Sequence, residues 1–393
     1  MKDNNIKTTS NISSPITGDE SELLFNLNGY PITEVYQKFN DNSFSFQTSF
    51  DQELRICKKT NHVFLGKLLP QEFIYNSENY NTLSSASHGS VTALNNFYNF
   101  ISNSLPSNIS TIIDIGANDT LMLKKFSDLN VDLIGIDPNI KSDDEKIICI
   151  KDYFENTEIL TNYSSGRVFL CSHTLEHIYD PRLFMSLLEK NALADDIYFF
   201  QFPSIDLLLR DLRFDQLHHQ HIHYFSVQSF KYLIEEFGFE LISYNLDPDH
   251  YGTLQACFRK KTSEGSIEIS DYIDPTIIEK SYKIYKEILF TADKRIEAVR
   301  GDFYCFGASL MLPILSYYLP SLINAKNIID DDTNKLGLSY VNFDREIINS
   351  SEIDYLNSNF VVTAVATKIA TRNIITRLSH LGAMNIILPL NTI

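Results

Sequence analysis

The segment Ile112–Pro138 reads IIDIGANDTLMLKKFSDLNVDLIGIDP and contains the pattern that decides the fold. An apolar run ends at Asp114, a turn of small residues follows around Gly116, and a helical stretch leads to a second apolar run that ends at Asp137. This succession predicts a strand, a turn, a helix and a second parallel strand, which is the first βαβ unit of a Rossmann-like sheet. Gly116 lets the backbone approach a ligand closely, because glycine has no side chain.

The charge of this turn indicates which ligand it accepts. A dinucleotide site usually carries G-x-G-x-x-G, so that bare amides and a helix N-terminus receive the pyrophosphate. Here Asp114, Asn118 and Asp119 accompany a single glycine. Carboxylates would repel a diphosphate but suit the sulfonium and ammonium groups of S-adenosylmethionine, and Asp137 can accept hydrogen bonds from both ribose hydroxyls. We therefore expect S-adenosylmethionine as the cofactor; the alternative is a βαβ unit of an unrelated α/β fold.

The chain of 393 residues is too long for one ordinary core, and its pattern divides into four parts. Residues 1–20, rich in Asn, Ser and Thr, are expected to be disordered, and residues 21–90 to form a small N-terminal region on the substrate side. Over residues 91–262, strands alternate with helices and end in a β-hairpin, which predicts a mostly parallel sheet with an antiparallel edge. Residues 263–393 begin with an amphipathic helix and continue as a second, smaller Rossmann-like domain around the turn Gly307–Ser309.

The expected fold class is therefore α/β, with two Rossmann-like sheets. The further strands expected are Lys146–Ile150, Arg167–Ser172, Ile197–Phe202, Glu240–Leu246, Thr253–Lys260, Asp302–Phe306, Asn327–Asp331, Phe360–Ala366 and Ala383–Pro389. The expected helices are Ala93–Ser104, Pro181–Ala192, Val227–Phe237 and Ile277–Val299.

Composition limits the partners. A net charge of −17 argues against nucleic acid or an anionic membrane as the main partner. The first twenty residues lack the apolar core of a signal peptide, and no apolar run is long enough to span a bilayer. The five cysteines form no CxxC pair. We expect a cytoplasmic, reduced protein, monomeric or homodimeric, without a metal site.

The segment Phe214–Phe225 holds four of the ten histidines and follows the strand 197–202, at the sheet edge where α/β proteins bind ligands. Three interpretations remain open. His219, His221 and His223 would share one face of a strand and could bind a metal ion. The cluster could be structural, or it could supply a general base, since neutral imidazole accepts protons near pH 7.

Two further residues are expected to lie beside the cofactor. His173 opens the polar segment His173–His177 just past the fourth strand, so that it can line the methionine pocket; the same segment could merely cap a helix. Phe154 follows the third strand, where an aromatic ring can cover the adenine.

These motifs resemble those of the bacterial sugar C-methyltransferases that act on nucleotide-linked 4-keto-deoxyhexoses. Asp114, Gly116, Asn118 and Asp119 match the family's D-I-G-x-N-D-G turn, with Thr120 in place of the last glycine. The segment Phe214–Phe225 is similar to F-D-Q-x-Y-H-E-H-x-x-Y-F, and 303–309 and 328–337 to the family's Y-G-A and D-x-N-x-K-x-G motifs. The segment Asn79–Ser85 resembles an active-site segment that carries Tyr and Ser residues.

The resemblance implies that His221 removes a proton next to the sugar ketone and that the resulting enolate attacks the donor methyl group. Tyr80 and His219 are then candidates to donate a hydrogen bond to the developing oxyanion. The resemblance also implies substrate contacts, for which the candidates are Ser84, Ser85, His218, Gln220 and Lys335.

The chain departs from the family pattern in three places. The family binds zinc through two CxxC pairs in its N-terminal part, whereas this chain keeps Cys57 and has Thr60 where a second cysteine would stand. His218 and Gln220 replace a tyrosine and a glutamate, and Leu310–Pro313 lacks the Lys and Gly that often follow the Y-G-A motif. These changes indicate a divergent member, for which O-methylation of an activated sugar and a non-catalytic paralogue are alternatives. A nicotinamide-dependent oxidoreductase is disfavoured, because the turn at Gly307 has one glycine where three are expected.

Overall fold

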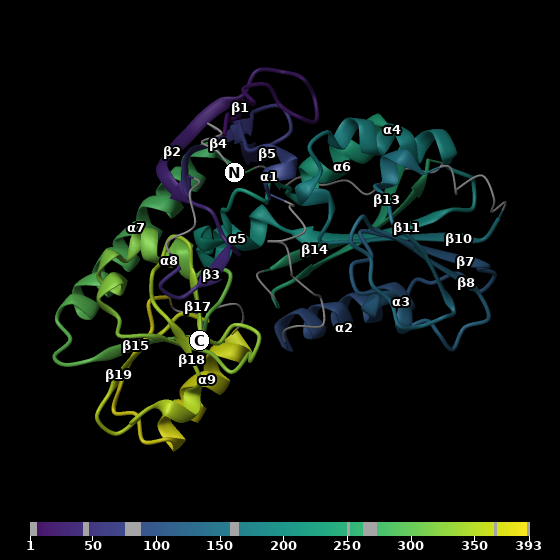
Figure 1. Ribbon diagram of the computed structural model, residues 1–393. Helices are drawn as coiled ribbons and strands as arrows, with labels where there is room; N and C mark the ends of the chain where they lie inside the picture. Colours follow the sequence, from purple (N-terminus) through teal and green to yellow (C-terminus); the bar gives the residue numbers. More distant parts are fainter. Residues whose placement is uncertain are drawn as a thin grey trace.

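The computed structural model describes residues 6–41, 47–74, 88–157, 165–249, 252–261, 273–364 and 368–390. Figure 1 shows two α/β units at opposite sides of the molecule, with the N-terminal strands and the long helix α7 on the side of the C-terminal unit. No helix in the described ranges is both long enough and apolar enough to cross a membrane.

The central unit is built on a seven-stranded sheet in the order β13-β14-β11-β10-β7-β8-β9. Its strands are β7 (Thr111–Ile115), β8 (Asp132–Ile136), β9 (Ile147–Ile150), β10 (Arg167–Ser172), β11 (Ile197–Pro203), β13 (Phe239–Asp247) and β14 (Thr253–Lys260). Pairing is parallel from β11 to β9, whereas β14 pairs antiparallel with both β11 and β13. This is the class I methyltransferase form of the Rossmann-like sheet, and it confirms the predicted fold class.

Helices cover both faces of this sheet (Figure 1). They are α2 (His88–Ser102), α3 (Leu121–Lys124), α4 (Pro181–Asn191) and α6 (Val227–Glu236), with short 3-10 turns η2 (Phe154–Asn156) and η4 (Leu175–His177). The helix α5 (Ile205–Asp211) and the 3-10 turn η5 (Phe214–Gln216) instead pack in a core shared with the N-terminal sheet. Ile113 packs with residues of α4 and α6, whereas its neighbour Ile112 packs with residues of α2 and α3. Successive strand residues point to opposite faces, so the apolar β7 run is buried on both sides.

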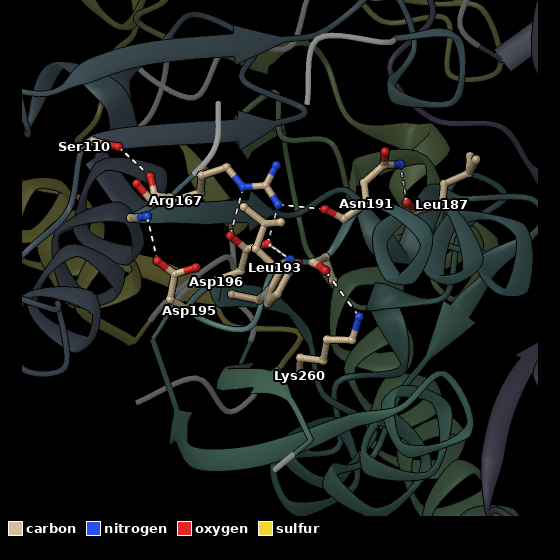
Figure 2. A network of polar contacts seen from close by, with 12 residues as sticks. Ser110, Arg167, Leu187, Asn191, Leu193, Asp195, Asp196 and Lys260 are labelled. Atoms are coloured by element: carbon tan, nitrogen blue, oxygen red, sulfur yellow. Dashed lines mark hydrogen bonds and ion pairs between the residues drawn. The ribbon is translucent and has the colours of Figure 1, made fainter. Parts of the chain in front are cut away.

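A buried ion pair joins the amino ends of β10 and β11 (Figure 2). The Arg167 guanidinium donates to both Asp196 carboxylate oxygens at 2.9 and 2.5 Å and to the Asn191 carbonyl at 2.7 Å. Asp196 also accepts from the amide of Leu193 and the hydroxyl of Tyr198. Because the pair lies at the sheet edge opposite the carboxyl ends of the strands, we assign it a structural role.

The N-terminal part forms a four-stranded antiparallel sheet, β12-β5-β4-β2. Its elements are β1 (Thr9–Ser10), β2 (Glu22–Pro31), β3 (Tyr36–Lys38), β4 (Ser49–Cys57), β5 (His62–Leu65), β6 (Lys67–Leu68) and α1 (Gln71–Ile74), and the edge strand β12 (His223–Tyr224) comes from the histidine-rich segment. The disorder expected for residues 1–20 is wrong for residues 6–20: β1 pairs with β6, and Ile16 is fully buried against the core of the central unit. Burial of Ile16 and the pairing of β1 with β6 order residues that their polar composition alone predicts to be disordered.

The C-terminal unit is a five-stranded parallel sheet in the doubly wound order β18-β16-β15-β19-β20. Its elements are α7 (Pro275–Glu297), β15 (Phe303–Phe306), α8 (Leu312–Tyr318), η6 (Pro320–Asn324), β16 (Ile328–Ile329), β17 (Leu338–Tyr340), β18 (Ile347–Ile348), η7 (Ser350–Glu352), β19 (Asn359–Val362), α9 (Lys368–His380) and β20 (Asn385–Ile387). β17 pairs with β3, and one hydrophobic core includes Leu54 of the N-terminal sheet, Leu289 of α7 and Val361 of β19. The N-terminal region therefore shares a hydrophobic core with the C-terminal unit. Its strand β5 also pairs with β12 of the histidine-rich segment, residues 214–225.

Candidate active site

A cavity of about 440 Å³ opens at the carboxyl ends of the central strands. Its walls come from all three parts of the chain: Glu34 belongs to the N-terminal region, Leu310 to the C-terminal unit, and the rest mainly to the central unit. Predicted site residues in its lining are Gly116, Asn118, Asp137, Phe154, His173, His218, Gln220 and His221. The structure thus brings two segments to one cavity: the turn at residues 116–120, called the cofactor turn below, and the histidine-rich segment, residues 214–225.

The cofactor turn has the conformation that its glycine permits. Gly116 has φ +80°, and a Cβ atom there would lie 2.0 Å from the hydroxyl oxygen of Thr174. Asn118 and Thr120 also adopt positive φ angles, 48° and 59°. Thr120 therefore keeps the left-handed backbone that glycine usually supplies, and its hydroxyl donates to Ser142 at 3.0 Å.

The carboxylates of Asp137, just after β8, and Asp114, near the end of β7, differ in their exposure to the cavity. Asp137 lines the cavity and accepts hydrogen bonds from the amides of Asn139 at 2.7 Å and Asn118 at 3.3 Å. Burial raises its pKa, and these two amides oppose the rise. Asp114 lies behind the wall with 2% of its surface exposed, and burial, together with the charges of Asp137 and Asp119, raises its pKa to about 7. We therefore expect Asp114 to act on a bound cation through its charge, whereas Asp137 is positioned for direct contact.

The aromatic pair after β9 differs from the prediction in one respect. Phe154 lines the cavity but is only 6% exposed and packs against Phe184 at a centroid distance of 5.3 Å. The adjacent Tyr153 also lines the cavity and is 43% exposed. Tyr153 lines the same cavity as Asp137, so its ring is a second aromatic surface available to an adenine. The signal in the sequence is that Tyr153 directly precedes Phe154 after the third strand.

His173 stands at the carboxyl end of β10 with a φ of 51°, an uncommon backbone conformation for a residue other than glycine. Its Nδ1–H donates to the Glu176 carboxylate at 3.2 Å. Strained residues of this kind gather at functional sites, and His173 lines the cavity.

The imidazoles of the histidine-rich segment point to different partners, which the spacing of the histidines in the sequence does not predict. His219 donates through Nε2 to the Tyr30 carbonyl at 3.0 Å and accepts from Gln52 at 3.2 Å. His223 donates to the Ile178 carbonyl at 2.7 Å, and its Nδ1 accepts from His62 at 3.1 Å. Burial lowers the pKa of both His219 and His223 to about 4, so both imidazoles are neutral.

These contacts bear on two interpretations of the sequence. His219 contacts the N-terminal sheet and is not among the cavity residues, and its role as oxyanion donor stays a prediction. His219, His221 and His223 do not converge, because only His221 lies among the cavity residues. The pairing of β12 with β5 fixes His223 against the N-terminal sheet.

His221 instead belongs to a group of imidazoles at the cavity wall. Its ring lies 3.8 Å from that of His218 and 4.9 Å from that of His177, centroid to centroid. Burial, followed by the neighbouring imidazoles of His177 and His219, lowers the pKa of His218 to about 3, while the nearby Gln220 opposes the shift. His177 belongs to the polar segment His173–His177, from which the sequence singles out only His173.

Gln220 and Lys335 are the two remaining described candidates for substrate contact. Gln220 lies at the wall, where its amide oxygen accepts a hydrogen bond from Thr33 at 3.2 Å. Lys335 lies in the C-terminal unit and donates to the Ala308 carbonyl at 2.9 Å, next to Asp330, which accepts from the Ala308 amide at 2.7 Å. Lys335 is thus at the second Rossmann-like turn and outside the lining of the central cavity. Tyr80, Ser84 and Ser85 fall outside the described residues.

The position of the family zinc site is occupied by hydroxyl groups. The Cys57 thiol lies 3.6 Å from the Thr17 hydroxyl. Burial acts to raise the pKa of Cys57, but the polar groups of Thr60, Ser14 and Thr17 outweigh it and lower that pKa. A single thiol among hydroxyls does not supply the thiolate set of a structural zinc site.

Most of the residues that line the cavity lie in a part of the chain that matches a known domain. Residues 87–244 match the model of a methyltransferase domain. The chain is similar to the C-methyltransferase NovU of Streptomyces niveus, with 24% identity over 150 residues, and the match spans 36% of this chain and 36% of NovU.

Two solved structures with a similar fold are methyltransferases. The 1,6-didemethyltoxoflavin-N1-methyltransferase of Burkholderia thailandensis is 12% identical, with a TM-score of 0.35, over 43% of this chain and 79% of that chain. Magnesium protoporphyrin IX methyltransferase of Synechocystis PCC 6803 is 10% identical, with a TM-score of 0.34, over 44% of this chain and 84% of that chain.

The strand order of the central unit is that of a class I methyltransferase sheet, and residues 87–244 match a methyltransferase domain. The family match ends at residue 244, before the antiparallel strand β14 completes the sheet.

Proposed function

We propose that this protein transfers the methyl group of S-adenosylmethionine to a carbon atom of a nucleotide-activated keto-deoxysugar. The observation that carries this proposal is the single cavity in which His221 faces the same space as the cofactor turn at Gly116, Asn118 and Asp137. The similarity to a C-methyltransferase supports carbon as the acceptor atom.

The residues of the turn fit the methyl donor. The Asp137 carboxylate can accept hydrogen bonds from ribose hydroxyls, Tyr153 and Phe154 offer aromatic surface for an adenine, and His173 in the same cavity is our candidate for contact with the methionine part. Bound S-adenosylmethionine would supply an electrophilic methyl group next to the histidine-rich wall.

The wall residues would act on the acceptor sugar. His221 takes the proton from the carbon next to the ketone, and the electron pair of that C–H bond passes into an enolate. Hydrogen-bond donors must stabilise the enolate oxygen, and Tyr80 remains the candidate from the sequence. Gln220 stands where the family has a glutamate, and Thr33 orients its amide. Lys335 and the turn at Gly307 would hold the nucleotide in the C-terminal unit.

Deuterium exchange separates this proposal from its rivals. The full chain is incubated in D₂O with S-adenosylhomocysteine and a panel of nucleotide-linked 4-keto-deoxysugars, and the sugars are examined by mass spectrometry. C-methylation predicts deuterium at the carbon next to the ketone, with loss of this exchange in His221→Ala. O-methylation predicts no deuterium exchange in this incubation, but methyl transfer to the sugar when labelled S-adenosylmethionine replaces S-adenosylhomocysteine.

His223→Gln is the matched control, because His223 belongs to the same segment but donates to the Ile178 carbonyl, away from the cavity. Retained exchange in this variant would assign the loss in His221→Ala to the base. Neither exchange nor methyl transfer on any sugar of the panel, with donor binding intact, would favour a non-catalytic paralogue and refute the proposal.

A further inference from the structure

Two side chains of the cavity wall, His177 and His221, form a set of metal ligands with the buried Glu176 behind them. Glu176, His177 and His221 each offer one ligand atom, and these atoms all lie within 4.8 Å of one another. Glu176 and His177 come from η4 after β10, whereas His221 comes from the histidine-rich segment. Two hydrogen bonds hold that segment against η4: the Ile222 amide donates to the Glu176 carbonyl at 2.8 Å, and His177 Nδ1 donates to the Gln220 carbonyl at 2.8 Å.

The second of these bonds also selects the tautomer of His177. Because Nδ1 carries the proton, the lone pair of this imidazole is on Nε2, which lies 4.0 Å from Glu176 Oε1. Metal-binding histidines in proteins usually have this arrangement, with the other ring nitrogen donating to a carbonyl or carboxylate. The backbone therefore presents His177 in the form that a metal ion requires.

The surroundings of the Glu176 carboxylate are an independent observation that points to a cation as ligand. Glu176 is fully buried, and while Oε1 accepts from His173, Oε2 has no hydrogen-bond partner among the described residues. A buried carboxylate oxygen without a partner is costly, because it has lost its water without compensation. A cation held between this oxygen and the imidazoles would remove that cost.

We propose that Glu176, His177 and His221 bind a divalent transition-metal ion of the Zn²⁺ type. Two imidazoles and one carboxylate suit zinc or cobalt better than Mg²⁺ or Ca²⁺, which prefer oxygen ligands alone. The ligand atoms must close to metal–ligand distances of about 2.0–2.2 Å, which small rotations of the side chains can achieve. The His177 side chain is 21% exposed, so an ion can reach the site from the cavity. The histidine spacing in the sequence does not predict this set of ligands, since they come from two separate segments.

The proposed site has a consequence that rests on the proposed function. A metal ion and a proton would use the same lone pair of His221, so metal binding excludes proton abstraction by this residue. Zn²⁺ should therefore inhibit the deuterium exchange described above, and removal of the metal with a chelator should restore it.

Metal binding is tested first without any activity measurement. The full chain, freed of metal by dialysis against a chelator, is titrated with Co²⁺ while its visible absorption is recorded, and Zn²⁺ then competes for the site. We expect one equivalent to bind, with affinity reduced at least about tenfold in Glu176→Gln and in His177→Asn. His177→Asn keeps a donor for the Gln220 carbonyl, so it decides the question if Glu176→Gln does not fold. His380→Gln is the control, because this histidine is exposed on α9 and should leave binding unchanged.

The site would be refuted if the wild-type chain bound no equivalent of Co²⁺, or if both ligand variants, with unchanged circular dichroism, bound it as tightly as the wild type. Exchange that continues at full rate with bound Zn²⁺ would refute the competition at His221. A chain that shows no exchange at any Zn²⁺ concentration counts against the proposed function, and the Co²⁺ titration then decides the metal site independently.

Discussion

Asp114 should make the affinity for S-adenosylmethionine depend on pH near neutrality. The carboxyl group is 2% exposed, and burial and two neighbouring carboxylates raise its pKa to about 7. In the protein without cofactor it is therefore about half ionised at neutral pH. A bound sulfonium cation stabilises the ionised form, so the ligand lowers the pKa of Asp114 and releases a proton as it binds.

The size of the effect follows from the fraction of ionised carboxylate. If the cofactor binds only the ionised form, a pKa of about 7 makes that form roughly 91% populated at pH 8 and roughly 9% at pH 6. The association constant should thus rise about tenfold from pH 6 to pH 8, equivalent to about 1.4 kcal/mol. Affinity falls as the pH drops, because Asp114 is mostly protonated below its raised pKa of about 7 and the neutral carboxyl group no longer attracts the cation.

Calorimetric titration at pH 6, 7 and 8, in two buffers of different ionisation enthalpy, measures both the affinity and the released proton. Asp114→Asn should bind the cofactor with weak, pH-independent affinity. S-adenosylhomocysteine, which lacks the sulfonium charge, should show a smaller pH dependence. A flat affinity from pH 6 to pH 8 without proton release, or a dependence that persists in Asp114→Asn, would refute the role assigned to this carboxylate.

Three further results are expected. Gly116→Ala should abolish cofactor binding and lower the melting temperature far more than Gly18→Ala, because both glycines have positive φ but only the Cβ at Gly116 meets another residue; equal losses in the two thermal melts would contradict this. Asp196→Asn should cost about 3–5 kcal/mol in urea unfolding, since it leaves a buried guanidinium uncompensated, and a cost below about 1 kcal/mol would be inconsistent with the geometry. His219 and His223 remain neutral in the folded protein but gain protons when unfolded, so stability should fall as the pH drops from 6.5 toward 4, by about 2 kcal/mol for each residue at pH 5. Unfolding of the double glutamine variant at pH 7.5 and pH 5 measures this slope, which should be smaller than in the wild type.

The central fold could be predicted because its signals are local. The run before Asp114 is buried on both faces, and Arg167–Ser172 and Thr253–Lys260 are strands at the expected bounds. Other expected strands, such as Asn327–Asp331, shrink to a short segment, Ile328–Ile329. Periodicity marks where apolar side chains can be buried, but hydrogen-bond partners decide where a strand ends.

The site could be predicted only in part, because its side chains are oriented by partners distant in the chain. His219 and His221 are two positions apart, and an extended segment would place them on one face. The carbonyl of Tyr30 in the N-terminal sheet instead draws His219 away from the cavity, while His177 lies against His221. No spacing within the histidine-rich segment contains that information.

The sequence alone determined the class of this protein: an acidic turn with one glycine between two apolar strands predicts the sheet and the charge of its ligand, because strand burial and backbone freedom depend on neighbouring residues. The tertiary structure alone decided which imidazoles share the cavity and that Glu176 is buried beside them. Those properties arise where β12 joins the N-terminal sheet and the histidine-rich segment packs on η4, and contacts between distant segments set both the burial and the direction of each side chain.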